Sequence, residues 1–186
     1  MKKDFYIVSL SQRMVSSALI RKASEQDLVS IDYLAKIVRE DMLKNGLMQW
    51  TGNYPSYEYF YQDCLKEGLF VYVLDGKIVA SVTVLPENDP PYKEVKWESD
   101  KALVIHRIIV SPFYQRQGIA RGLFEFVIAK GKQEGYEAIK IDTHPDNIKM
   151  QKLLATFNFV YRGYLSSINR YAYERLLQTN EGLGDL

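Results

Sequence analysis

Segments with the patterns of β-strands and of helices alternate along this chain in the order β-α-α-β-β-β-α-β-α-β-β. The strand-like segments are short runs rich in Val, Ile, Leu, Phe and Tyr, whereas the helix-like segments repeat apolar residues every three or four positions. The order predicts a mixed α/β fold in which helices cover the faces of a single sheet. The predicted strands span residues 18–23, 69–74, 78–84, 102–110, 138–143, 159–165 and 168–173, and the predicted helices span residues 24–45, 56–67, 117–134 and 147–157.

Turn and capping residues support several of these boundaries. Asp75-Gly76 lies between two strand-like runs, and this dipeptide is typical of a β-hairpin because both residues tolerate a positive φ. Ser24, with Asp27 three residues later, resembles the capping box that begins a helix, and Gly46 is a typical helix stop. The sequence therefore predicts a long amphipathic helix followed, after a second helix, by a hairpin.

Length and charge limit the class of protein. The chain has 186 residues, with 24 Lys and Arg against 23 Asp and Glu and a formal net charge of +1. A domain of this size buries roughly 70% of its unfolded surface, so it needs neither metal nor disulfides for stability. We assign residues 18–175 to one domain, residues 1–17 to an N-terminal extension and residues 176–186 to a C-terminal tail. Near-neutral charge disfavours nucleic acid as a partner.

The cysteine content and the hydropathy pattern indicate the compartment. Cys64 is the one cysteine, so no intrachain disulfide is possible. No segment reaches the ~20 consecutive apolar residues of a membrane helix. Residues 1–17 lack the unbroken apolar core of a secretory signal. We expect a cytoplasmic protein with no membrane association and no metal site.

The stretch most informative about function is residues 104–123, where a predicted buried strand leads through a short loop into a helix. Helix N-termini carry unpaired N–H groups and a partial positive charge, so they bind phosphate on backbone donors. Gly118 and Ala120 would allow an anion to approach closely, and Arg116 and Arg121 add positive charge. From the residues alone, Gly118 could equally do no more than begin the helix. The sequence contains no ATP-binding P-loop motif and no dinucleotide-binding Gly motif after a strand.

The loop resembles the acyl-CoA loop of the GNAT family of N-acetyltransferases, whose pattern is Gln/Arg-x-x-Gly-x-Gly/Ala and which here reads Gln115-Arg116-Gln117-Gly118-Ile119-Ala120. The resemblance extends over residues 18–173, and it implies a GNAT fold. That fold has a central mixed, mostly antiparallel sheet with a splayed pair of strands and with helices on both faces. Other segments similar to cofactor-binding parts of the family are residues 108–112, Asp142-Thr143 with Asn147, and Phe157-Asn158-Phe159.

The resemblance implies acetyl-CoA as the cofactor and direct transfer of its acetyl group to an amine. No acyl-enzyme is expected, so Cys64 is not needed as a nucleophile. Pantetheine is expected to enter between the strand that ends near Val110 and the strand that ends near Thr143. The expected cofactor-binding residues lie on one strand, one loop and two helix starts: Ile108, Ile109, Val110, Gln115, Arg116, Gln117, Gly118, Ile119, Ala120, Arg121 and Asn147.

The sequence departs from the family pattern at the group that would protonate the leaving thiolate. Many members have a Tyr seven residues after the Asn, but this chain has Leu154. The attacking amine must also lose a proton, and the candidate bases are His106, His144 and Glu98. Each has a structural alternative: a hydrogen-bonded core histidine, a loop cap and a solvated surface charge, respectively.

Aromatic residues gather around the loop between the first two predicted helices. Trp50 and Tyr54 are the candidates for binding the acceptor, because aromatic walls receive apolar or cationic amines. The same residues could instead form core between helix and sheet. We predict an acetyl-CoA-dependent N-acetyltransferase acting on a small-molecule, peptide or protein amine. A homodimer is compatible with this prediction. The alternative is a catalytically silent CoA-binding module.

Overall fold

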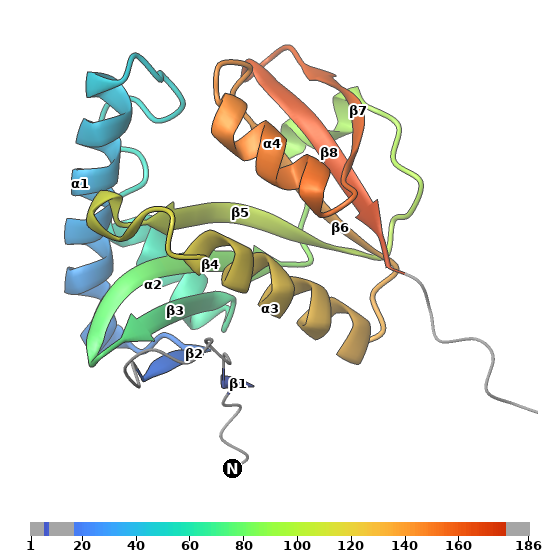
Figure 1. The fold of residues 1–186 in the computed structure, drawn as a ribbon. Helices are drawn as coiled ribbons and strands as arrows, with labels where there is room; N and C mark the ends of the chain where they lie inside the picture. Colours follow the sequence, from blue (N-terminus) through green and yellow to red (C-terminus); the bar gives the residue numbers. More distant parts are fainter. Residues whose placement is uncertain (1–5, 8–16, 178–186) are drawn as a thin grey trace, which may run out of the picture. The chain divides into compact units, whose positions relative to one another are not determined.

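The computed structural model describes residues 6–7 and 17–177 of the chain. It divides into two compact units, Met1–Leu85 with Ile105–Phe126, and Pro86–Val104 with Val127–Leu186. Strand β5 (Ala102–Val110) and helix α3 (Ile119–Gln133) each contribute residues to both units. The units are therefore described one at a time, with the element labels of Figure 1.

The first unit contains a sheet with the strand order β1-β2-β3-β4-β5. The pairs β1/β2, β2/β3 and β3/β4 are antiparallel. The turn of the β3/β4 hairpin is Asp75-Gly76, and both residues have positive φ, as the sequence predicts. The elements are β1 (Tyr6–Ile7), β2 (Ala18–Lys22), α1 (Leu28–Lys44), α2 (Tyr57–Leu65), β3 (Leu69–Leu74), β4 (Lys77–Leu85), and short 3-10 helices at Glu25–Asp27 and Pro112–Tyr114.

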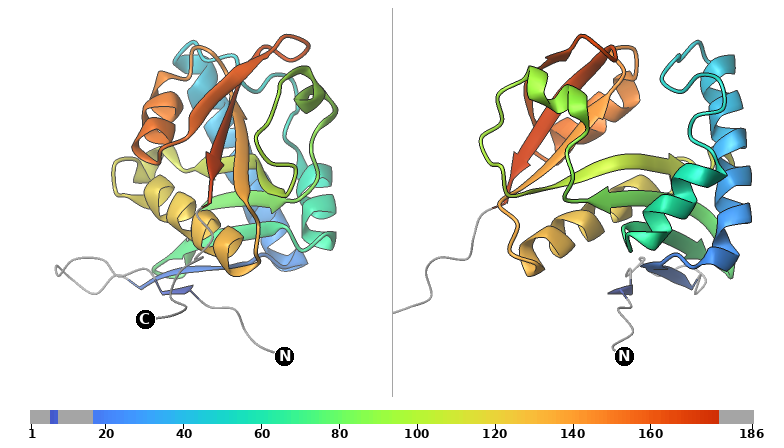
Figure 2. Two further views of the ribbon diagram at one scale, coloured as in Figure 1. Left: turned by 90° about the vertical axis from the view of Figure 1, so that its right-hand side faces the viewer. Right: turned by 180° about the vertical axis from the view of Figure 1, so that it is seen from behind.

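The two faces of strand β3 are both buried, and each faces a different helix layer. Leu69 and Val71 belong to a core with α1 and α2 that also includes Phe60. Phe70, on the opposite face, packs against Phe126 of α3 with ring centroids 4.9 Å apart. The continuous apolar run of β3 follows from this, because a strand covered on both faces does not alternate polar and apolar residues. Figure 2 shows α1 and α2 in front of these strands in its right-hand view.

The second unit contains the antiparallel strands β6 (Ala138–Thr143), β8 (Arg170–Leu176) and β7 (Val160–Leu165), in that order. Helix α4 (Ile148–Thr156) follows β6, and a short 3-10 helix spans Pro90–Glu94. Asn147 begins α4, because its side-chain oxygen accepts a hydrogen bond from the Met150 amide at 3.1 Å. The core of this unit contains Tyr92, Val104, Leu165 and Ala172.

Several predicted boundaries are confirmed. The strands at 102–110 and 138–143 have the predicted bounds. The capping box predicted at Ser24 and Asp27 is present, and the helical segment that it begins opens with a 3-10 turn, Glu25–Asp27, before α1 starts at Leu28. There the Asp27 carboxylate accepts hydrogen bonds from both the backbone N–H and the hydroxyl of Ser24. Of the predicted extension and tail, residues 1–5, 8–16 and 178–186 lie outside the described part of the chain.

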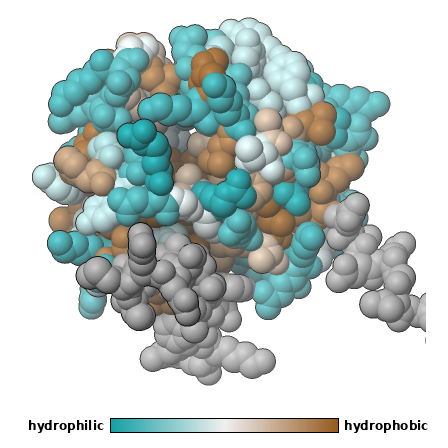
Figure 3. Space-filling model, viewed as in Figure 1, coloured by the Kyte–Doolittle hydropathy of each residue, from teal (hydrophilic) through white to brown (hydrophobic). Residues whose placement is uncertain are grey.

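The surface mixes polar and apolar residues. In Figure 3, hydrophobic patches lie among hydrophilic side chains on the face that is viewed. Such mixing is ordinary, since more than half of a folded protein's surface is apolar. Within the described ranges no helix is both long and apolar enough to cross a membrane.

Candidate active site

The loop between β5 and α3 has a backbone suited to binding an anion. The amide of Ser111 donates to the carbonyl of Val79 at 2.9 Å, which fixes the end of β5 in the first unit. Residues 115–118 are exposed, and both Arg116 (φ 61°) and Gly118 (φ 79°) have left-handed backbone conformations. Backbone turns that bring successive N–H groups to one side make anion-binding concavities, and left-handed residues are typical of such turns.

Gly118 is the position where the loop meets the helix N-terminus. A Cβ at Gly118 would meet no atom within 4 Å, so its surroundings are open, while its positive φ favours glycine. Helix α3 begins at Ile119, and the carbonyl of Gly118 accepts from the Gly122 amide at 2.9 Å. The first N–H groups of α3 follow directly after this open position, and a helix N-terminus is where backbone N–H groups bind phosphate.

Strand β5 directs neighbouring side chains to opposite faces of the sheet. Ile109 is fully buried in the core that α1 and α2 form. Arg107, two residues earlier, lies on that same face, whereas His106 and Ile108 alternate to the other face. The candidate base His106 thus points away from the face on which Arg107 lies.

Arg107 and Asp63 form a buried ion pair that the sequence analysis did not identify. Arg107 Nε donates to Asp63 Oδ2 at 2.9 Å, and Nη2 donates to Asp63 Oδ1 at 2.7 Å. Arg107 Nη1 donates to the Tyr54 hydroxyl at 3.3 Å. Burial alone would lower the pKa of Arg107, but the hydrogen bonds and charge of Asp63 raise it above its ordinary value. The guanidinium stays charged and fixed in orientation.

The two predicted acceptor-binding residues differ in their surroundings. Trp50 is 5% exposed and belongs to the core of the first unit, as the structural alternative expects. Tyr54 is half-buried, and its ring meets Tyr59 edge to face with centroids 4.9 Å apart. Tyr54 therefore contacts Arg107 through its hydroxyl, and its ring meets that of Trp50 edge to face at 6.5 Å between centroids, so Tyr54 stays the candidate for acceptor binding.

His144 lies in the second unit, directly after β6. It is buried, and its Nδ1 accepts a hydrogen bond from the Asp146 amide at 3.1 Å. Its Nε2 lies 3.1 Å from the side-chain amide of Asn169. Both ring nitrogens have partners within the unit, which is the geometry of a loop cap.

Glu98 also lies in the second unit, where it is 58% exposed and pairs with Arg162 at 3.1 Å. Arg162 in turn donates to the buried carboxylate of Glu174 at 2.8 Å. The same Glu174 accepts from the Glu98 amide at 2.9 Å. Glu98 is therefore part of a charged network.

Leu154, at the position of the family's usual Tyr, is fully buried in α4.

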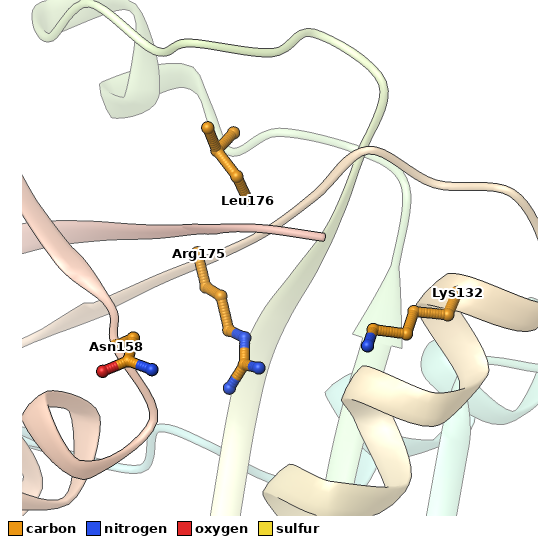
Figure 4. Close-up of a pocket in the computed structure, with 4 residues that line it drawn as sticks. All are labelled: Lys132, Asn158, Arg175 and Leu176. Carbon is orange, nitrogen blue, oxygen red and sulfur yellow. The ribbon is translucent and has the colours of Figure 1, made fainter. Parts of the chain in front are cut away.

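A separate polar pocket of about 230 Å³ lies at the C-terminal end of α3, in the second unit. Figure 4 shows the amino group of Lys132 and the guanidinium of Arg175 on its walls, together with Asn158 and Leu176. Arg175 Nη1 donates to the Phe157 carbonyl at 2.7 Å, and burial lowers the pKa of Arg175. None of these residues is among the predicted cofactor ligands, although Asn158 lies in the segment Phe157-Asn158-Phe159 that resembles a cofactor-binding part of the family. Asn158 has a φ of 56°, a left-handed conformation that asparagine tolerates.

Other reactive side chains of the chain have structural surroundings. Cys64 packs against the core of the first unit, and burial raises the pKa of its thiol. A thiol with a raised pKa is a poor nucleophile. In the part of the chain that the structure describes, no three His, Cys, Asp or Glu side chains are grouped so as to hold a metal ion.

Comparison with known proteins identifies the class. The family model for the acetyltransferase (GNAT) family matches residues 32–159, more than half of the chain. The chain belongs to this family. It is 29% identical over 89 residues to human N-acetyltransferase 8, a match that covers 48% of this chain and 37% of that protein. The chain thus spans well under two thirds of that relative.

Solved structures share the fold. A GNAT-family acetyltransferase from Streptococcus agalactiae is 24% identical, with a TM-score of 0.82, over 95% of this chain and 100% of that one. The PaiA N-acetyltransferase of Thermoplasma acidophilum, solved with coenzyme A, is 14% identical with a TM-score of 0.69, over 86% of this chain and 99% of that one. The predicted GNAT fold is therefore confirmed. The splay of the strands ending near Val110 and Thr143 stays a prediction.

Proposed function

We propose that this chain is an acetyl-CoA-dependent N-acetyltransferase that transfers the acetyl group directly to an amino group of a small molecule, peptide or protein. The observation that carries the proposal is the exposed loop before α3, with left-handed Arg116 and Gly118 and open space at Gly118. It combines with membership of a family of acetyltransferases. The amine acceptor, a cytoplasmic location and a homodimer are parts of the proposal, and sedimentation tests the last.

The residues of the first unit fit the expected cofactor. Backbone N–H groups of Gln117–Ala120 would hold the pyrophosphate, with Gln115, Arg116 and Arg121 beside it. Backbone groups of Ile108–Val110 would orient the pantetheine arm and polarise the thioester carbonyl. Asn147, which begins α4, stays a predicted cofactor ligand by its resemblance to the family. Acetyl-CoA would supply the acetyl group as a thioester, so that transfer to the amine would release the CoA thiolate and one proton from the nitrogen.

Proton transfer is the part of the proposal that the geometry constrains least. His106, His144 and Glu98 stay the candidate bases, although His144 and Glu98 each have partners in the second unit. Variants His106→Gln, His144→Gln and Glu98→Gln, assayed for kcat across pH, separate them. Loss of the acidic limb of the pH profile in one variant identifies the base. If all three retain the limb, water or the substrate takes the proton.

The cofactor site is tested by thermal unfolding with and without acetyl-CoA. A ligand that binds only the native state raises Tm by mass action. We expect acetyl-CoA to raise the Tm of the natural chain and to have no effect on Gly118→Glu, because the new carboxylate adjoins the N–H groups that would hold phosphate. ATP and NAD serve as ligand controls.

A matched variant, Gly76→Glu, separates this effect from backbone strain. Gly76 has a φ of 77° against 79° at Gly118, and a Cβ at either position would meet no atom within 4 Å. Both variants therefore add one negative charge at a strained, open position. Retention of the acetyl-CoA effect in Gly76→Glu and its loss in Gly118→Glu support the site. Equal binding by both variants contradicts it.

The alternative, a catalytically silent CoA-binding module, is favoured by Leu154 at the position of the usual acid. Release of free CoA thiol in the presence of an amine distinguishes the two. Turnover of any amine excludes the silent module, whereas a Tm increase without turnover across a broad amine panel favours it.

A further inference from the structure

The guanidinium of Arg107 is held among the acceptor-side residues of the first unit. Its Cζ lies 5.9 Å from the ring centroid of Tyr54 and 5.4 Å from that of Tyr59. Arg107 directly precedes Ile108, a proposed thioester-orienting residue, so its side chain leaves the backbone one residue from the expected reaction centre.

Asp63 fixes the orientation of Arg107. The Asp63 side chain is 4% exposed and accepts both the Nε and Nη2 hydrogen bonds described above. A third donor, the Thr83 hydroxyl of β4, bonds to Asp63 Oδ2 at 2.7 Å. With three donors on one carboxylate, neither partner can turn without losing hydrogen bonds to a buried charge.

This pairing leaves one edge of the guanidinium for another partner. An arginine has five N–H donors, and the Asp63 and Tyr54 contacts use three of them. The side-on pairing through Nε and Nη2, together with the Nη1 bond to Tyr54, leaves one N–H on Nη2 and one N–H on Nη1, which we call the open edge of the guanidinium. The Arg107 side chain is 12% exposed, and among the described residues its ion pair is with Asp63.

We propose that the open edge of Arg107 binds a carboxylate of the acceptor, which makes amines that also carry a carboxylate, such as α-amino acids, the preferred substrate class. The inference rests on the proposed acetyl transfer. Parallel N–H groups on a planar fork match the two oxygens of a carboxylate, a match that a lysine cannot provide. The half-buried Tyr54 and the exposed Tyr59 would contact the apolar part of the same molecule.

Matched acceptors test the proposal. One set is L-phenylalanine, L-phenylalaninamide and 2-phenylethylamine, which share a ring and a primary amine but of which only the first has a free carboxylate. The acid, amide and decarboxylated amine of alanine and of leucine form two further sets. We expect the natural chain to show the highest kcat/KM on the free acids. Arg107→Gln should lower kcat/KM for the acids by about 10- to 100-fold and change that for the carboxylate-free amines by less than about threefold.

Two further variants keep the test decisive if Arg107→Gln folds poorly. Arg107→Lys retains a charge beside Asp63 but loses the fork, so discrimination for the acids should fall while Tm changes less. Arg21→Gln is the matched control, because Arg21 makes a similar two-point pair with Asp27, at 2.7 and 2.9 Å, far along the chain from β5. It should keep the natural preference.

Three results would overturn the proposal: equal kcat/KM on acids and amides, equal losses on all acceptors in Arg107→Lys, or no turnover of any carboxylate-bearing amine. Thermal unfolding with acetyl-CoA is measured on every variant in parallel. A natural chain that acetyl-CoA does not stabilise counts against the proposed function instead. A chain that binds acetyl-CoA and ignores the carboxylate counts against Arg107 alone.

Discussion

Arg107 in the first unit and Lys140 in the second are both basic side chains on strands, and they are held in different ways. Arg107 has hydrogen bonds to Asp63 and Tyr54. Lys140 is fully buried, and its Nζ lies 4.8 Å from the ring centroid of Trp97 with no hydrogen-bond partner among the described residues. Burial lowers the pKa of Lys140, and the charges of Glu174 and Asp100 oppose that shift.

The difference follows from the neighbouring carboxylates. Glu174 lies directly opposite Lys140 in the β6/β8 register, yet its oxygens accept from Arg162 and from the amides of Glu98 and Ser99. Asp63 gives both of its oxygens to Arg107. The planar guanidinium of Arg107 is oriented by Asp63, which binds it with both oxygens. The ammonium of Lys140 lies over the aromatic face of Trp97, because the oxygens of Glu174 already have other donors.

Removing Asp63 should have the largest effect. Asp63→Ala leaves the buried Arg107 charge and the Thr83 hydroxyl without their acceptor, so we expect a loss of about 3–5 kcal/mol in the free energy of unfolding. Urea denaturation measures it. The double variant Asp63→Leu/Arg107→Met, which removes both charges, should recover most of the loss. A double variant as unstable as Asp63→Ala would contradict this account.

A second arginine pair in the first unit shows how exposure reduces the effect. The hydrogen bonds of Arg21 lower the pKa of Asp27 to about 2, although burial opposes the shift, and Arg21 is 32% exposed. Because the native pKa lies below the unfolded value of 3.8, the stabilisation is complete above about pH 4 and is lost as pH falls toward 2. We expect Asp27→Asn to lose about 1–2 kcal/mol at neutral pH.

Denaturation of both chains at successive pH values checks the sign. The difference between the natural chain and Asp27→Asn should shrink between about pH 4 and pH 2. A difference that stays constant over this range would mean that the loss comes from the helix start, where Asp27 also accepts from Ser24. Ser24→Ala separates that contribution.

The sequence predicts elements well where the signal is local. The strands at 102–110 and 138–143 are runs rich in strand formers. Asp75-Gly76 predicts the hairpin turn because both residues tolerate the positive φ that the turn requires. The capping box at Ser24 and Asp27 is also a local signal, although it does not show that the first turn is a 3-10 turn, since 3-10 turns are frequent at helix N-termini. Helix ends are the least determined by local pattern.

The candidate site was predictable only in part. The loop at residues 115–120 has a short motif, so the sequence indicates it, and its positive φ values fit that prediction. The Arg107–Asp63 pair joins residues 44 positions apart, and Asp63 stands on a helix among other polar residues, with nothing in the pattern to mark it as buried. Trp50 was a candidate for acceptor binding but belongs to the core. The sequence could not separate these two roles, because an aromatic residue in a loop has the same local pattern in both.

Replacing Lys140 should change the free energy of unfolding the least. A large loss would contradict the difference drawn above between Lys140 and Arg107. Lys140→Met replaces a buried ammonium without leaving Glu174 unpaired, since Arg162 and two amides still bond to it. We expect stability within about 1 kcal/mol of the natural chain, or slightly above it.

The pH dependence gives this prediction its sign. The native pKa of Lys140 lies below its ordinary value of 10.5, so in the interval between them the unfolded chain binds more protons than the native one. The stability of the natural chain therefore gains from Lys140 as pH rises through that interval, a gain that Lys140→Met lacks. Any advantage of the variant, measured by urea denaturation, should be greatest near neutral pH and shrink toward pH 10.5. A loss above about 2 kcal/mol at neutral pH would mean that the ammonium over Trp97 stabilises the second unit much as the Asp63 pair stabilises the first.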